Sequence, residues 1–159
     1  MEKMKVEINN EVRLSEHFKL AELCKTSVRT ADGNIPSHEA IENLKRLSGW
    51  LEMLRSEWNK RYGDGDDPVI INSGYRSAQV NKAVGGVATS NHLTGCAVDI
   101  RVLGMEQLLR YAVILLDISD ESQEDFDELL IERNAKGTYW LHFAVRPEGN
   151  RRKIRLIAC

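Results

Sequence analysis

The segment from Ile70 to Arg101 constrains the fold of this 159-residue chain more than any other part of the sequence. It carries Arg76, His92 and Asp99 among residues that are otherwise mostly small and turn-forming. Buried apolar surface stabilises a core by about 25 cal/mol per Å², so a segment that served only the core would place large apolar side chains at these positions. We therefore expect this segment to bring polar groups together for chemistry.

Two runs in and beside this segment have the pattern of β-strands. Residues 68–72 form a short apolar, β-branched run after a turn rich in Gly and Asp, which predicts a buried strand. Residues 96–102 alternate in character, as a second strand would. Because successive side chains of a strand point to opposite faces, Asp99 lies on the less apolar face, beside small residues that leave room for a ligand.

Between these two strands the sequence predicts a short helix and a loop. Ser77 is suited to cap a helix over residues 77–84, and the two glycines that follow are suited to end it, because glycine tolerates the positive φ of helix ends. The loop after this helix carries Ser90 and His92.

A third polar group comes from the strand predicted at residues 138–145. The apolar residues of this run share one face, and His142 lies on the other. Imidazole nitrogens and carboxylate oxygens both bind Zn²⁺, at about 2.0–2.2 Å, and a catalytic zinc site keeps three protein ligands and a water. His92, Asp99 and His142 are therefore candidate metal ligands. We also weigh Cys96 as a ligand, but the alternation points its thiol away from Asp99 and favours a buried, inert cysteine.

A series of motifs connects these residues in chain order: Ser73-Gly74-Tyr75-Arg76-Ser77, Val80-Asn81, Val84-Gly85-Gly86, Ser90-x-His92-x-x-Gly95-x-Ala97-x-Asp99 and Trp140-x-His142. Together they resemble the zinc D-Ala-D-Ala carboxypeptidases and related peptidoglycan peptidases of the M15 class. The likeness is closest to a compact, phage-associated or Bacteroides-type branch, and it extends from about Leu14 to Val145.

The resemblance implies an α+β fold of the hedgehog/D-Ala-D-Ala-peptidase type, in which an antiparallel sheet carries the zinc and helices pack on the sheet. It implies that His92, Asp99 and His142 hold one Zn²⁺. We therefore expect a zinc metallopeptidase that hydrolyses an amide bond in peptidoglycan stem peptides, as a D-Ala-D-Ala carboxypeptidase or an endolysin-type endopeptidase. The alternative is a catalytically inactive, zinc-containing module that binds cell-wall peptides.

At the position of the usual catalytic base, this sequence departs from the pattern of several relatives. In those relatives a Glu or Asp three residues before the second histidine serves as the base, and here that position is Tyr139. A strand predicted at residues 126–132 places Glu128, Leu130 and Glu132 on one face, and a hairpin pairs it with the strand of His142. Similar compact members carry a Glu at the place of Glu132, so we expect Glu132 to be the base and keep Glu128 as the alternative.

The resemblance also assigns substrate binding. It places Arg76 against the substrate, where a guanidinium can hold a carboxylate or carbonyl bidentately and stabilise an oxyanion; the alternative for Arg76 is a structural salt bridge. We expect Ser90 to orient its loop or contact the substrate. We expect Tyr75 and Trp140 to line the cleft.

The remaining sequence predicts helices within a single domain that spans residues 1–159. Residues 1–13 form a lead-in, 14–146 the core and 147–159 a C-terminal strand or tail. Amphipathic helices are predicted for Ser15–Thr26, for a long segment opening at Pro36 and continuing through Trp58, and for Met105–Ile118, followed by a surface loop over Ser119–Asp125. The basic, alternating run at residues 151–157 is typical of an edge strand protected by charge.

Composition and charge limit the classes of partner and the cellular location that we expect for this chain. The net charge of -2 argues against a nucleic-acid partner, and the sequence has neither an apolar run of 18 residues for a membrane span nor an apolar stretch in residues 1–10 for a secretion signal. Three cysteines at unrelated spacings do not suggest a disulfide framework. We expect a bacterial or phage protein, monomeric and cytoplasmic in the producing cell, with release to the wall by a phage holin as one route to its substrate.

Overall fold

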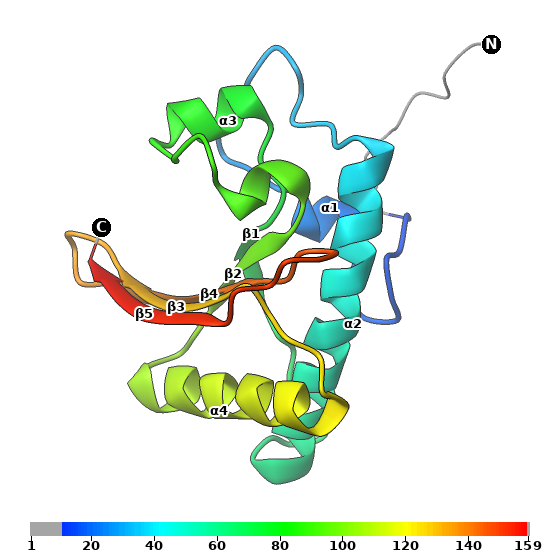
Figure 1. Cartoon of the computed structure of the whole chain (residues 1–159), viewed down its shortest axis with the longest axis vertical. Helices are drawn as coiled ribbons and strands as arrows, with labels where there is room; N and C mark the ends of the chain where they lie inside the picture. The colour runs from blue at the N-terminus through cyan, green and yellow to red at the C-terminus, as the bar shows by residue number, and fades with distance from the viewer. Residues whose placement is uncertain (1–10, 159) are drawn as a thin grey trace.

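A sheet of five strands runs through the middle of the molecule (Figure 1). The computed structural model describes residues 11–158, so residues 1–10 of the predicted lead-in and Cys159 lie outside the described part. All neighbouring strands are antiparallel except the last two, which are parallel. In spatial order the strands are β1 (Ile71–Ser73), β2 (Ala97–Arg101), β4 (Tyr139–Ala144), β3 (Glu128–Arg133) and β5 (Lys153–Ala158).

Helices lie on both sides of this sheet. In the view of Figure 1, α4 (Met105–Ser122) lies below the sheet, α3 (Ala78–Ala83) lies above it, and the long α2 (His38–Arg61) stands to its right. The remaining helical turns are α1 (Leu20–Leu23) and the 3-10 helix η1 (Asn91–Thr94). Within residues 11–158, none of the helices combines the length and the apolar character that crossing a membrane requires.

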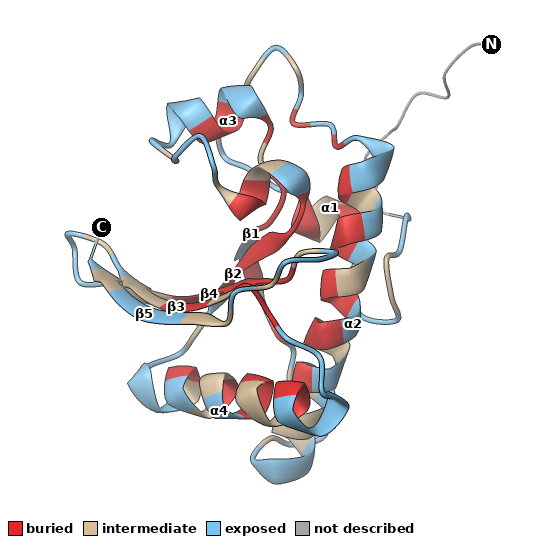
Figure 2. Cartoon of the chain, in the orientation of Figure 1, coloured by how far each residue is buried: buried red, intermediate tan, exposed pale blue. Residues whose placement is uncertain are grey.

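The core fills the space between one face of the sheet, α2 and α4. The leucines of α2 at positions 44, 47, 51 and 54 are buried, and Ile41 and Trp58 of the same helix are partly buried against them. Trp50 packs its ring against Phe143 of β4, with ring centroids 5.4 Å apart. Figure 2 shows the buried residues concentrated on the sides of α2 and α4 that face the sheet, and along the central strands, whereas β5 is largely exposed. The opposite face of the sheet is therefore available for polar chemistry.

Most of the predicted elements are confirmed. The helix after Ser77 is α3, and the Ser77 side chain accepts a hydrogen bond from the Val80 amide, 3.2 Å away. The strands predicted around Asp99 and His142 are β2 and β4, and the edge strand predicted from the basic tail is β5. The α+β class with helices packed on a sheet is likewise confirmed. The sheet departs from the predicted antiparallel pattern only where β5 joins it.

The helix predicted for Ser15–Thr26 is wrong, because only Leu20–Leu23 is helical and its N-cap is Lys19. The chain turns instead, and the Leu14 and Ser15 amides donate to the Phe18 carbonyl. His17 stabilises this turn by bonding to Glu52 of α2, with 2.7 Å between His17 Nδ1 and Glu52 Oε1. Four side chains of this segment are nevertheless buried in the core: Phe18, Leu20, Leu23 and Cys24.

Two boundaries also differ from the prediction. Helix α4 continues to Ser122, so the first part of the loop predicted at Ser119–Asp125 is helical. Leu109 of this helix is 50% exposed, while Tyr111 and Ile114 face the core. The strand predicted at 68–72 is shorter and later, since only Ile71–Ser73 pairs with β2, through an irregular register.

Gly95 joins η1 to β2 and shows why this connection needs glycine. Its φ is +74°, which L-amino acids with a side chain rarely adopt. A Cβ at this position would lie 2.5 Å from the Ala40 carbonyl oxygen of α2. The backbone therefore approaches α2 closely between His92 and Asp99.

We predict that Gly95→Ala lowers the free energy of unfolding by about 2–4 kcal/mol, because it adds a left-handed backbone penalty to a clash with backbone atoms. The matched control is Gly49→Ala in the exposed middle of α2, where a Cβ meets nothing within 4 Å. That control should raise stability by about 0.5–1 kcal/mol. Denaturant unfolding of both variants checks the prediction, and equal effects of the two substitutions would contradict it.

Candidate metal centre

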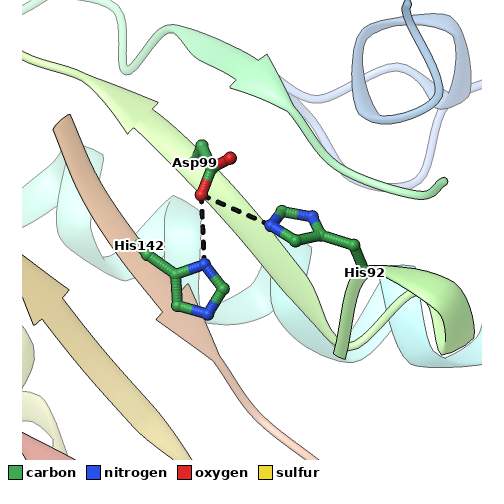
Figure 3. Close-up of side chains that lie close together, drawn as sticks. All are labelled: His92, Asp99 and His142. Atoms are coloured by element: carbon green, nitrogen blue, oxygen red, sulfur yellow. Dashed lines mark hydrogen bonds and ion pairs between the residues drawn. The ribbon is translucent and has the colours of Figure 1, made fainter. Parts of the chain in front are cut away.

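Three side chains from three separate elements meet on the polar face of the sheet. His92 comes from η1, Asp99 from β2 and His142 from β4 (Figure 3). Each offers one ligand atom, and these atoms lie within 4.8 Å of one another. All three residues are buried, with exposed fractions of 2%, 8% and 6% in chain order. The structure thus brings together the three ligands predicted from the sequence.

The pairing of β2 with β4 places two of the candidate ligands. Asp99 lies directly opposite His142 in the antiparallel register, so both side chains point to the same face. The neighbours of each ligand along its own strand, such as Val98 and Phe143, point into the core. The register that packs the core is therefore the register that joins Asp99 to His142.

The third candidate ligand, His92, is held by the turn before β2. The Ser90 hydroxyl caps η1 by accepting a hydrogen bond from the His92 amide, at 3.2 Å. The Nδ1 of the His92 ring lies 2.6 Å from the Gly74 carbonyl oxygen, which can only accept, so this nitrogen carries the proton. His92 Nε2 is then unprotonated in the neutral ring and lies 3.4 Å from Asp99 Oδ1.

His142 is oriented from its other side. Its Nδ1 lies 3.1 Å from Asp99 Oδ1, and its Nε2 lies 3.1 Å from Glu128 Oε1. In a neutral ring, donation of the Nε2 proton to Glu128 would leave Nδ1 free for a metal. The site thus offers two imidazole nitrogens and one carboxylate oxygen, which is a donor set that suits zinc. The outer nitrogen of each imidazole faces a hydrogen-bond acceptor, as the histidine ligands of zinc sites usually do.

Opposite charges stabilise the ionised forms of this cluster. Burial raises the pKa of Asp99, but the charge that His92 carries in its protonated form, together with hydrogen bonds from His142 and protonated His92, outweighs burial and holds the pKa of Asp99 well below its usual range. Burial lowers the pKa of His142, but hydrogen bonds to Asp99 and Glu128, with the nearby charge of Glu132, raise it to about 10. Without a metal, His142 therefore carries a proton at neutral pH.

Arg76 lies next to the metal ligands. Its Nη2 lies 3.2 Å from Asp99 Oδ2, the carboxylate oxygen that does not face the two histidines. Its Nε donates to Ser73 Oγ at 3.2 Å, and its Nη1 lies 3.5 Å from Asn81 Oδ1. The salt bridge kept as an alternative for Arg76 is thus present, and the guanidinium also lines the cleft beside the histidines, where donors remain for a substrate.

Both candidate bases flank His142 from β3. Leu130 is the direct partner of His142, and Glu128 and Glu132 lie two residues to either side of Leu130 on the same face. Glu132 Oε1 lies 3.3 Å from His142 Nδ1, the nitrogen that faces Asp99. Glu128 binds the opposite nitrogen of the ring. The two carboxylates therefore approach His142 from different sides.

A buried network behind Glu128 was not predicted from the sequence. The Asn91 amide group donates to Glu128 Oε1 at 2.6 Å and to Asp127 Oδ2 at 2.7 Å. Asp127 is fully buried and binds Arg151 through both of its oxygens. Burial raises the pKa of Asp127, but the bonds from Arg151 and Asn91 lower it to about 2. Asn91 is the unspecified residue of the Ser-x-His motif, so only its place beside His92 hints at this role.

A cleft of about 420 Å³ opens beside His92 and His142. Ser90 lines it, as expected, together with both candidate bases. Tyr75 packs instead in the hydrophobic core, and Trp140 is not among the residues that line the cleft. A larger cleft, of about 720 Å³, lies by His17 and Glu52. Among residues 11–158, only His92, Asp99 and His142 form a cluster with metal-ligand geometry.

The two described cysteines are free, buried thiols. Burial raises the pKa of Cys96, and its thiol faces the Thr94 carbonyl oxygen rather than the metal ligands. The interpretation of Cys96 as an inert, buried cysteine is therefore consistent with its surroundings.

Comparison with known proteins adds a family to this geometry. The family model described as Peptidase M15 matches residues 16–115, which is more than half of the chain. The chain is also similar to the zinc D-Ala-D-Ala carboxypeptidase of Streptomyces albus G, with 30% identity over 84 residues. That alignment covers 53% of this chain but only 31% of the relative. The matched family region contains His92 and Asp99, whereas His142 joins them through the sheet pairing.

We predict that zinc binding at pH 7.5 releases a proton from His142, because a metal must displace the proton held with a pKa of about 10. The zinc association constant should rise about tenfold per pH unit between pH 7.5 and 9 and level off above the pKa. Titration calorimetry in two buffers of different ionisation enthalpy measures the released proton. Binding without proton release would contradict the prediction.

The raised pKa also links pH to stability. Protonated His142 stabilises the metal-free fold fully below the ordinary histidine pKa of 6.5, and this contribution is lost as the pH rises through about 10. The control is Glu128→Gln, which removes one of the groups that raise the pKa. In that variant the stabilisation from protonated His142 should be lost at a lower pH than in wild type. The zinc affinity of the variant should fall by about 10–100-fold, as happens when other hydrogen-bond partners of metal-ligating histidines are removed.

Proposed function

Because this chain belongs to the peptidase M15 family, we propose that it is a zinc-dependent peptidase that cuts an amide bond in peptidoglycan stem peptides. The observation that carries this proposal is the convergence of His92, Asp99 and His142 beside two carboxylates in an open cleft. The bond cut is that of a D-Ala-D-Ala carboxypeptidase or of an endolysin-type endopeptidase. The activity named for the Streptomyces albus G relative supports this substrate class.

His92 Nε2, Asp99 Oδ1 and His142 Nδ1 would hold the zinc, because these are the atoms that face one another. A zinc ion bound there would polarise the scissile carbonyl and lower the pKa of a water toward neutrality. The chain itself supplies the orientation of the ligands. The Gly74 carbonyl and Glu128 each accept from the outer nitrogen of one ring, and Arg76 binds the outer oxygen of Asp99.

Glu132 is the proposed general base. It would accept a proton from the attacking water as the new C–O bond forms, and pass that proton to the leaving amine as the C–N bond breaks. Its carboxylate lies beside His142 Nδ1, on the side of the ring that faces the other ligands. Glu128 is less suited to this role, because its Oε1 already accepts from Asn91 and faces the outer nitrogen of His142.

Arg76 is the proposed substrate contact, and Ser90 has a positioning role. The Arg76 guanidinium would bind a substrate carboxylate or carbonyl with the donors that Asp99 and Ser73 do not use, and would stabilise the oxyanion. Ser90 lies at the cleft but also caps η1, so its proposed contribution is to orient His92. Tyr75 and Trp140 are proposed to act only indirectly, by supporting the strand and loop that carry the site.

The second candidate, an inactive binding module, rests on Tyr139, which stands where several relatives have an acidic base. In this structure Tyr139 packs against the core, on the face opposite His142. An acidic side chain at that position of this strand would not face the cleft. This observation favours the peptidase, with a base supplied by β3. We further propose that the enzyme acts as a monomer and reaches the wall from the cytoplasm through a phage holin.

We predict that Glu132→Gln keeps one bound zinc but lowers the rate of peptide release from purified peptidoglycan by about 10²–10⁴-fold, the usual contribution of a general base. The comparison variant is Glu128→Gln, assayed at saturating zinc, which should lose far less activity. Chromatography of released D-Ala and new amino termini, with and without chelator, provides the measurement and identifies the bond.

The opposite ranking of the two glutamates would assign the base to Glu128. A zinc-loaded wild-type protein that binds wall peptides and releases nothing would support the binding module instead.

A further inference from the structure

The cleft beside the metal centre has a second wall, made by the edge strand β5 and the loop before it. Four cationic residues line the cleft: Arg76, Arg146, Arg151 and Lys153. Three of them pair with buried carboxylates. Arg76 binds Asp99, and Arg146 and Arg151 bind Asp127, with N–O distances of 2.8–3.2 Å.

Lys153 differs from these three arginines. It is half-buried at the cleft, and within the described residues it forms no ion pair. Its neighbour across the strands is Glu128, but that carboxylate is already bound to His142 and Asn91, and its second oxygen lies 4.0 Å from Arg151. The carboxylate nearest in register is thus committed to the metal centre, and the ammonium group is left for a ligand.

The sheet directs Lys153 toward the same side as the metal ligands. The parallel register pairs Lys153 with Glu128, and Glu128 shares a face with Leu130, the partner of His142. Strand spacing and residue rise place the Lys153 Cα roughly 12 Å from the His142 Cα. An extended peptide spans about 3.3–3.6 Å per residue, so this separation corresponds to roughly three residues of an extended substrate between the metal centre and Lys153.

We propose that Lys153 binds a carboxylate of the stem peptide at a subsite distinct from Arg76. This inference rests on the proposed peptidase function and adds a specificity determinant to it. A stem peptide offers two such groups, the α-carboxylate of a γ-linked D-Glu and the C-terminal carboxylate. Either would exchange its water for a charge-assisted hydrogen bond inside a partly enclosed cleft.

The test uses the peptide L-Ala-γ-D-Glu-L-Lys-D-Ala-D-Ala and two analogues, one amidated at the D-Glu α-carboxyl and one at the C-terminus. The variant is Lys153→Met, which keeps the length of the side chain. The matched control is Arg155→Met, which removes one positive charge from the same face of β5 at an exposed residue outside the cleft lining. Readouts are kcat/KM of the zinc-loaded protein and the affinity of the metal-free protein by calorimetry.

One analogue should bind wild type about tenfold more weakly than the parent peptide, the effect of one charge-assisted bond. Lys153→Met should bind the parent peptide more weakly than wild type by the same factor. The variant should bind that analogue no more weakly than it binds the parent peptide, as a coupled pair requires. The analogue affected identifies which carboxylate is bound. Arg155→Met should behave as wild type.

The inference is overturned if Lys153→Met distinguishes the three peptides as wild type does, or if the control reproduces its effect. Failure of the peptidase proposal has a different signature, in which zinc-loaded wild type cuts none of the peptides. In that case the peptide affinities of metal-free wild type and Lys153→Met, measured by calorimetry, still decide whether Lys153 binds a carboxylate. If none of the peptides binds, the proposed role of Lys153 is wrong.

Discussion

The opposition of Asp99 and His142 across β2 and β4 is the contact on which the rest of the site depends. Side chains of a strand alternate between faces, so a slip of β2 by one residue against β4 would carry Asp99 into the core, away from His142, and expose Val98 to water. The apolar packing of α2 and α4 against the sheet therefore fixes the positions of Asp99 and His142. Gly95 and the Ser90 cap then bring His92 to a pair that is already in place.

Charge balance explains the second feature of the site. Asp99, Glu128 and Glu132 surround His142, and in the absence of metal a proton on His142 compensates part of their charge. A divalent cation would replace that proton. Behind the ligands, Asn91 connects Glu128 to Asp127, whose charge Arg151 and Arg146 neutralise. Arg151 and Arg146 are thus occupied with structure, whereas Lys153 lines the same cleft and forms no ion pair within residues 11–158.

The convergence of His92, Asp99 and His142 could be predicted from the sequence, because strand alternation and short motifs are local properties. It predicts the helix at Ser15–Thr26 wrongly, because the bond from His17 to Glu52 joins segments far apart in the chain and favours a turn. Periodicity carries no information on strand direction, so it cannot show that β5 runs parallel to β3. The contacts of Asn91 with Asp127 and Glu128 likewise appear only when η1 and β3 are brought together.

The most direct test of this account is the zinc content of purified protein after dialysis against metal, compared between wild type and His142→Ala. His142 lies outside the matched family region and joins the site only through the pairing of β2 with β4. We predict one tightly bound zinc in wild type and its loss in the variant, with the fold retained by circular dichroism. Equal zinc binding by a folded His142→Ala protein would contradict the central claim that the sheet register builds the metal centre.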